Sequence, residues 1–159
     1  MLRWSEFAEV RPDMAAGGAG LLYEHGGLGL GFLATVRPDG GPRVHPICPV
    51  LAVNLYGFIL PGPKLADLRR DGQYALHSET FPPPNHDDGL YITGVVDELE
   101  DAPLRSALTE QFLAERSLDA PWPGFEDQAL VEFKMDLVLL TLTQPRHGLP
   151  AGHTTWRAS

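Results

Sequence analysis

The stretch L-A-T-V-R-P-D-G-G-P-R-V-H-P, residues 33–46, places two extended segments on either side of a tight turn. The first segment, residues 31–37, is apolar and partly β-branched, which is typical of a buried strand. The pair Asp39-Gly40 favours a hairpin, because these residues tolerate the backbone angles of a tight turn. The returning strand covers residues 43–53, and two prolines interrupt its hydrogen-bond ladder.

The chain on both sides of this hairpin predicts short elements separated by many glycines and prolines. Four further strands are expected at residues 54–60, 73–80, 89–100 and 129–143. Helices are expected within residues 4–25, at residues 64–71 and after the capping residue Asp101, and residues 81–88 form a stiff loop. The last stretch, residues 144–159, has no periodicity and is predicted to be a tail. Six strands with peripheral helices indicate one antiparallel barrel domain spanning residues 1–159.

The composition is that of a globular protein, with 43% hydrophobic and 21% charged residues in a chain of 159. No apolar run approaches the roughly 20 residues of a membrane helix, so we expect no membrane span. The N-terminus carries charges where a signal peptide is apolar, and the single cysteine, Cys48, cannot form an internal disulfide. These features predict a cytoplasmic protein without a metal site.

The formal net charge of −9 argues against nucleic acid as a partner, because phosphate backbones are bound by clustered cations. The charges are unevenly distributed along the chain. Residues 37–71 hold five basic and three acidic residues, whereas residues 72–136 hold three basic and fourteen acidic residues. This local excess of positive charge favours a small anionic ligand bound by residues 37–71, and chance clustering on a solvated surface is the alternative.

The hairpin is followed by a strand and then by P-K-L-A-D-L-R-R-D-G-Q-Y-A-L-H at residues 63–77. Together these segments resemble the pyridoxamine 5′-phosphate oxidase-like family over about residues 31–112. The resemblance implies a mainly β chain with peripheral helices, built as a six-stranded antiparallel split barrel that binds flavin mononucleotide (FMN). It also implies a homodimer with the cofactor pocket at the interface. The apolar run in residues 131–143 independently favours such an interface.

The resemblance assigns the cofactor to a strand and to the start of a helix. The strand that opens with Arg43 would lie along the flavin ring and its phosphate arm. Lys64 matches the family's lysine at the phosphate, where a helix N-terminus also attracts anions. A C-terminal tryptophan would reach the pocket of the dimer, as in a short family ending. The implied cofactor-binding residues are Arg43, Val44, His45, Pro46, Gly62, Lys64 and Trp156.

Two departures from the family pattern narrow the function. The loop Leu60-Pro61-Gly62-Pro63-Lys64 offers no hydroxyl, and its prolines offer no N–H, although Gly62 permits close backbone approach. This loop leaves room for a deazaflavin cofactor as the alternative to FMN. The chain also lacks the Arg- and Trp-rich substrate motif of the pyridoxamine 5′-phosphate oxidases, so that substrate is not expected.

Three hypotheses remain open at this stage. The first is a flavin-dependent oxidoreductase of unknown substrate, in which the flavin performs the electron chemistry. The second is a non-catalytic protein that binds or carries a flavin or a deazaflavin, and the third is a barrel whose pocket binds nothing. No catalytic residue is assigned. His45 and, more weakly, His77 are candidates to face a flavin ring, with a structural role as the alternative.

Overall fold

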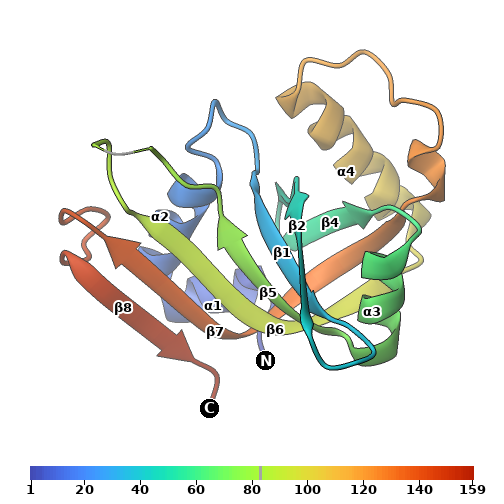
Figure 1. Cartoon of the computed structure of the whole chain (residues 1–159). Helices are drawn as coiled ribbons and strands as arrows, with labels where there is room; N and C mark the ends of the chain where they lie inside the picture. Colours follow the sequence, from blue (N-terminus) through green and yellow to red (C-terminus); the bar gives the residue numbers. More distant parts are fainter. Residues whose placement is uncertain (83) are drawn as a thin grey trace.

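A computed structural model describes residues 1–82 and 84–159, and it is mainly β with helices at the periphery (Figure 1). The strands are β1 (Gly31–Val36), β2 (Pro42–Ile47), β3 (Val50–Leu51), β4 (Leu55–Ile59), β5 (Gln73–Ser78), β6 (Gly89–Leu99), β7 (Ala129–Leu142) and β8 (Gly152–Arg157). The α-helices are α1 (Trp4–Val10), α2 (Pro12–Leu22), α3 (Pro63–Asp71) and α4 (Ala102–Glu115). The predicted fold class is confirmed.

All six predicted strands are present, and two further strands are added to them. Cys48 and Pro49 leave the ladder, so the predicted strand at residues 43–53 is divided into β2 and β3. The second addition lies in the predicted tail, which is a correction: residues 152–157 form β8 against β7. The helices predicted within residues 4–25 are confirmed as α1 and α2. The predicted loop at residues 81–88 contains Pro83, which lies outside the described residues.

The strands form one antiparallel sheet in the order β2-β1-β5-β6-β7-β4-β3, with β8 also paired to β7. The long strand β7 pairs with β6 along one side. On the other side of β7, β4 pairs with the first part of the strand and β8 pairs with the last part. Between them, Leu2 and Met135 exchange two backbone hydrogen bonds of 2.8 and 2.9 Å. The sheet is curved but not closed, so the edges at β2 and β3 remain apart as a split.

A bulge marks the middle of the β6–β7 pair. Thr93 is opposite Leu137 and Gly94 is opposite Met135, so Asp136 is an extra residue on β7. The strands approach so closely here that a Cβ on Gly94 would lie 1.8 Å from the carbonyl oxygen of Lys134. Glycine is therefore required at this position.

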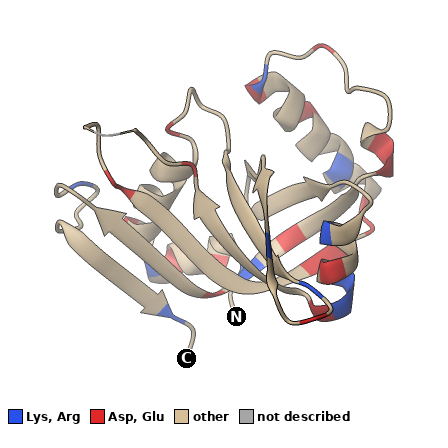
Figure 2. Ribbon diagram, in the orientation of Figure 1, with Lys and Arg blue, Asp and Glu red and all other residues tan. Residues whose placement is uncertain are grey.

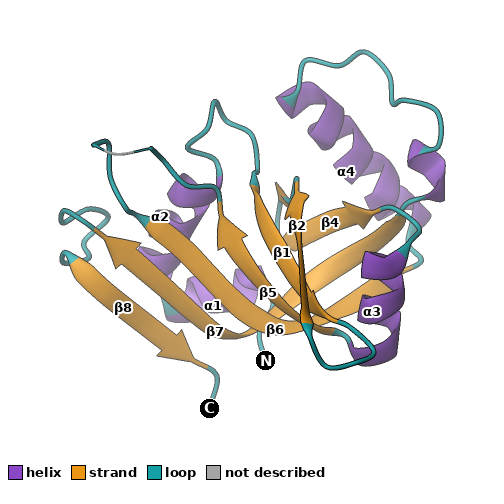
Figure 3. Ribbon diagram, viewed as in Figure 1, coloured by secondary structure: helices purple, strands orange, loops and turns teal. Residues whose placement is uncertain are grey.

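Helices α1 and α2 contact β7, and α2 also contacts β6, all on one face of the sheet (Figure 3). The buried core includes Phe7, Leu33, Leu76, Ile92, Phe133 and Leu140. α3 packs against β1, and α4 contacts β3, the last strand in the pairing order. The side chain of Asp101 caps α4 by accepting the N–H of Leu104 at 2.9 Å, as predicted. Within the described part of the chain, no helix is both long and apolar enough to cross a membrane.

Candidate functional site

A cleft opens at the split of the barrel, where the ends of β2 and β4 meet the first turn of α3. Its volume is about 190 Å³. The walls are mostly apolar, and the lining residues are Pro46, Ile47, Cys48, Phe58, Leu60, Lys64, Phe112, Trp122 and Gln128. The structure thus brings together two of the residues predicted from the sequence, Pro46 and Lys64.

Lys64 supplies the cation of this cleft. Its side chain is half-buried, and no described carboxylate lies within 4.0 Å of its ammonium. Burial lowers the pKa of this ammonium from its ordinary value of 10.5, because the charged form loses hydration. The chain's other lysine, Lys134, forms an ion pair with Asp97. Lys64 is therefore the lysine with its charge available to a ligand.

Arg43 is oriented by Asp67, about one helical turn beyond Lys64 on α3. Its Nε donates to Oδ2 of Asp67 at 2.7 Å. The hydroxyl of Thr35 donates to the same oxygen at 2.9 Å, and Arg70 donates to the other oxygen at 3.2 Å. The Arg43 guanidinium, with help from Thr35 and Arg70, holds the pKa of the Asp67 carboxyl below its usual value. Two guanidinium groups share one carboxylate, so the cluster keeps one positive charge.

The remaining strand residues lie along the edge of the sheet. Within the described residues, β2 pairs with β1 on one side, and its other backbone edge is open to a ligand. Val44 is 60% exposed, and Pro46 is also exposed. His45 alternates with them and is half-buried. An apolar strip beside free backbone groups therefore leads to the mouth of the cleft.

Gly62 and the prolines beside it form the turn before α3. Gly62 has a φ of 151° and is exposed, and a Cβ there would meet no atom within 4 Å. The helix begins at Pro63, which has no N–H, and no side chain caps its first turn. The first N–H groups of α3 are thus left to solvent or to a ligand.

Trp156 is not brought to the cleft of its own chain. It lies on β8, and its ring packs 5.1 Å from the ring of Phe7 on α1, measured between centroids. Figure 1 shows β8 at the opposite end of the sheet from α3. His77, on β5, also lies outside the cleft, and its Nδ1 is 2.7 Å from the carbonyl oxygen of Ser78.

Seven of the nine described residues that line the cleft were not assigned to a ligand from the sequence, and three of these lie far along the chain from the hairpin. Phe112 falls in the helix expected after Asp101, and Trp122 and Gln128 were not singled out. Gln128 is 6% exposed, and its Nε2 has no hydrogen-bond partner among the described residues. A tryptophan between two prolines, Pro121 and Pro123, was the available signal that this loop packs on something.

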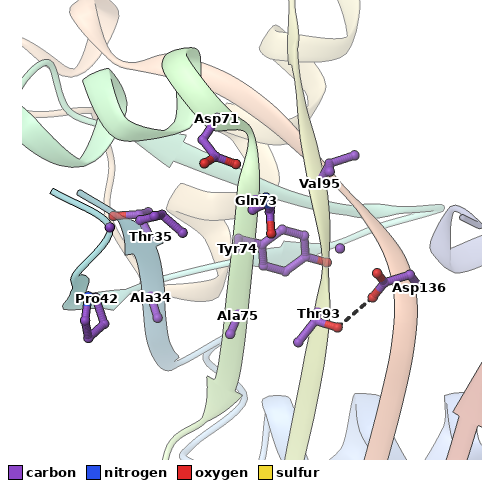
Figure 4. A pocket seen from close by; sticks show the side chains of 13 residues that line it. Ala34, Thr35, Pro42, Asp71, Gln73, Tyr74, Ala75, Thr93, Val95 and Asp136 are labelled. Atoms are coloured by element: carbon purple, nitrogen blue, oxygen red, sulfur yellow. Dashed lines mark hydrogen bonds between the residues drawn. The ribbon is translucent and has the colours of Figure 1, made fainter. Parts of the chain in front are cut away.

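A wider hollow of about 710 Å³ lies on the sheet face opposite α1 and α2 (Figure 4). Its floor consists of small or apolar side chains such as Ala34, Ala75 and Val95. Thr93 donates a hydrogen bond of 2.6 Å to Asp136 at the bulge. Asp136 and Asp71 are the charged residues that line the hollow, and neither is a cation. This hollow therefore does not suit a phosphate.

No protein-family model matches the sequence, and no curated protein is a detectable relative. Solved structures are similar. A putative pyridoxamine 5′-phosphate oxidase from Listeria innocua is 17% identical, with a TM-score of 0.58 over 75% of this chain and 90% of the other. An FAD-binding protein from Mesorhizobium loti is 18% identical, with a TM-score of 0.61 over 78% and 91%. A conserved hypothetical protein from Mycobacterium tuberculosis is 18% identical, with a TM-score of 0.61 over 76% and 79%.

These structural similarities agree with the family resemblance found in residues 31–112. The TM-scores of 0.58 and 0.61 show that the fold is shared. Because the sequences are only 17% and 18% identical, the ligand has to be argued from the site itself. The chain has the split-barrel fold of the pyridoxamine 5′-phosphate oxidase-like proteins.

Proposed function

We propose that the protein is a flavin-dependent oxidoreductase that binds FMN at the mouth of the cleft and acts on a substrate other than pyridoxamine 5′-phosphate. The observation that carries the proposal is Lys64, a half-buried cation without a carboxylate partner at the split of the barrel. A buried charge is costly unless it is paired. An anionic ligand at Lys64 removes this cost.

The neighbouring residues fit the rest of such a cofactor. Lys64 and the first N–H groups of α3 would bind the phosphate. The Arg43–Asp67–Arg70 cluster, which joins β2 to the same helix, adds its remaining positive charge. The flavin ring is too large for the cleft, and the exposed strip at Val44 and Pro46 offers it an apolar surface. When bound, the flavin supplies the electron chemistry, and the chain supplies orientation and charge. The FAD-binding protein of the same fold supports a flavin-type ligand.

The loop before α3 keeps a deazaflavin as the alternative cofactor. Pro61, Gly62 and Pro63 provide no hydroxyl, and the two prolines provide no N–H, so few donors are available for a phosphate monoester. The same site would also suit a carrier function, in which this protein binds a flavin or a deazaflavin without catalysing a reaction. The reduction experiment below separates these functions.

A homodimer is part of the proposal. On the face opposite α1 and α2, half-buried apolar side chains include Phe32, Tyr91, Leu137 and Leu139. Strands β5 to β8 are uncharged over most of their length (Figure 2). A second copy of the chain, related by a two-fold axis, would cover this face and the hollow within it. Each cofactor would then lie close to both chains.

Calorimetric titration with FMN and with riboflavin tests the assignment of Lys64. Lys64→Ala is expected to weaken FMN binding about tenfold to a hundredfold and to leave riboflavin binding unchanged, because only FMN carries the phosphate. Lys134→Ala is the matched control, since Lys134 is already paired with Asp97. Equal losses for both ligands would remove Lys64 from the phosphate site.

Anaerobic titration of the FMN-loaded protein with NADH or NADPH tests the activity. Loss of the visible flavin absorbance is the expected result. A protein that binds FMN but is reduced by neither donor is better described as a carrier. A protein that binds FMN no more tightly than riboflavin, and a deazaflavin more tightly than both, has the alternative cofactor. Failure to bind any of them refutes the proposal.

A further inference from the structure

The cleft has properties that a phosphate does not need. Phe58, Phe112 and Trp122 contribute aromatic walls, and the rings of Phe58 and Phe112 meet edge to face with centroids 5.8 Å apart. The Trp122 ring lies 6.0 Å from that of Phe112 and is 43% exposed at the rim. Aromatic walls of this kind favour a flat apolar ring as ligand.

The size of the cleft limits that ligand to about one ring. An engineered protein cavity of about 150 Å³ holds benzene, whereas pockets for drug-sized ligands have about 300–1,000 Å³. At about 190 Å³, this cleft has room for a single ring with one small substituent. The three fused rings of a flavin do not fit inside.

Two residues that line the cleft, Lys64 and Gln128, carry hydrogen-bond donors. Gln128 is buried, and its Nε2 has no partner among the described residues, which is unfavourable when nothing accepts from it. The ammonium of Lys64 is the second donor. Among the described residues that line the cleft, none is Asp or Glu. The missing counterpart is therefore an acceptor with negative charge.

We propose that the cleft binds a small aromatic carboxylate. The ring lies among Phe58, Phe112 and Trp122, and the carboxylate accepts hydrogen bonds from Lys64 and Gln128. Two donors match the two oxygens of a carboxylate, whereas a phosphate monoester has three oxygens and a greater charge. Arg43, which could supply further donors, is held by Asp67. This proposal goes beyond the proposed function, and Lys64 is the residue that the two share.

Benzoate is the probe, titrated into the purified full-length chain without added flavin. Binding is followed by calorimetry and by the fluorescence of Trp122, with Trp122→Phe identifying that signal. Saturable binding of benzoate is expected. Benzyl alcohol, which lacks the charge, and acetate, which lacks the ring, are expected to bind at least about tenfold more weakly. Failure of benzoate to bind, or equal binding of acetate, refutes the proposal.

Gln128→Met tests the buried amide. Methionine has a similar size and no N–H, so the variant is expected to fold and to bind benzoate about tenfold more weakly. Gln144→Met, at an exposed glutamine after β7, is the matched control. Gln128→Glu, which places a carboxylate against a carboxylate, is expected to abolish binding. Unchanged affinity in Gln128→Met refutes the assignment of the amide.

An FMN titration of the same variants separates this proposal from the proposed function. Gln128→Met is expected to lose benzoate affinity and to keep FMN affinity. Normal FMN binding by a wild-type protein that does not bind benzoate refutes only the carboxylate site. Benzoate binding by a protein that binds no flavin refutes only the proposed function.

Discussion

Nε of Arg43 and Oδ2 of Asp67 are 2.7 Å apart, so the guanidinium at the start of β2 is fixed against α3. Asp67 is 2% exposed and also accepts hydrogen bonds from Thr35 and Arg70. Arg70 in addition donates to the carbonyl oxygen of Val36, at the end of β1. One buried carboxylate therefore joins three elements at the side of the cleft, and its charge offsets part of the positive charge there.

Asp67→Asn is expected to destabilise the protein at pH 7, because two guanidinium groups then lack their buried partner. The pKa of Asp67 is lowered in the folded protein, so its contribution to stability is full above the unfolded pKa of about 3.8. That contribution is lost as the pH falls through the lowered folded pKa. Urea unfolding of wild type and variant should thus show a difference that is large at pH 7 and smaller at pH 3.

Asp119→Asn is the control for this prediction, since Asp119 is exposed and forms no ion pair with a described residue. It should change the stability little at either pH. A stability difference for Asp67→Asn that is equal at pH 7 and pH 3 would show that the carboxylate charge is not the cause.

Lys64 predicts a pH dependence of anion binding. Its pKa is lowered from 10.5 by burial, so the free protein loses this charge at a lower pH than an ordinary lysine would. Benzoate and FMN affinities should therefore begin to fall with rising pH before pH 10.5. Lys64→Arg, whose guanidinium stays charged, should shift this fall to higher pH or remove it.

Cys48→Ser is the necessary control, because Cys48 is the other titratable group that lines the cleft. The fall in affinity with rising pH should persist in this variant, because burial is the main cause of the lowered pKa of Lys64. A profile that disappears in Cys48→Ser and persists in Lys64→Arg would assign the effect to the thiol.

Much of the fold follows from local patterns in the sequence. Alternation and β-branching located the six main strands, and Asp101 marked the start of α4 because a side-chain cap is a local interaction. The strand β8 was missed because its residues, with few apolar side chains, are held by pairing with β7. Pairing between segments close in space leaves no period of its own in a polar sequence.

The site could be predicted only in part for a related reason. Pro46 lies on the returning strand of the hairpin and Lys64 lies at the start of the helix after the next strand, and the family resemblance over this part of the chain assigned both. Gln128 joins the cleft from the start of β7, more than 60 residues later, and nothing near it in the sequence indicates a ligand. The engagement of Arg43 by Asp67 depends on how α3 docks, which is a property of packing.

Trp156→Ala is expected to lower the free energy of unfolding by about 2 kcal/mol. The ring is half-buried and packs on Phe7, so its loss should cost less than the 3–5 kcal/mol of a fully buried aromatic residue. Thermal or urea unfolding measures the change. Ligand affinity should be unaltered, since the ring lies outside the cleft of its own chain.

If Trp156→Ala weakens FMN binding without lowering stability, the tryptophan reaches the cofactor of a partner chain, as the family resemblance implied. Val53→Ala, at an exposed apolar residue, is the control for nonspecific losses.

The last prediction concerns the apolar sheet face opposite α1 and α2. Leu139 is half-buried there, between Val138 and Leu140, which are fully buried on the helix-covered side. Sedimentation should give about twice 17.4 kDa for the wild type at micromolar concentration. Leu139→Glu is expected to give a monomer, because a carboxylate buried between two apolar faces lacks a partner.

Leu118→Glu is the matched control, since Leu118 is an exposed leucine after α4 and away from that face. It should remain dimeric. A monomeric wild type would exclude the dimer and leave Leu137 and Leu139 half-exposed in solution. A wild-type dimer that Leu139→Glu does not dissociate would place the contact on another surface. In a monomeric Leu139→Glu protein, weakened FMN binding with retained benzoate binding would show that the cofactor needs both chains, whereas the cleft is complete within one.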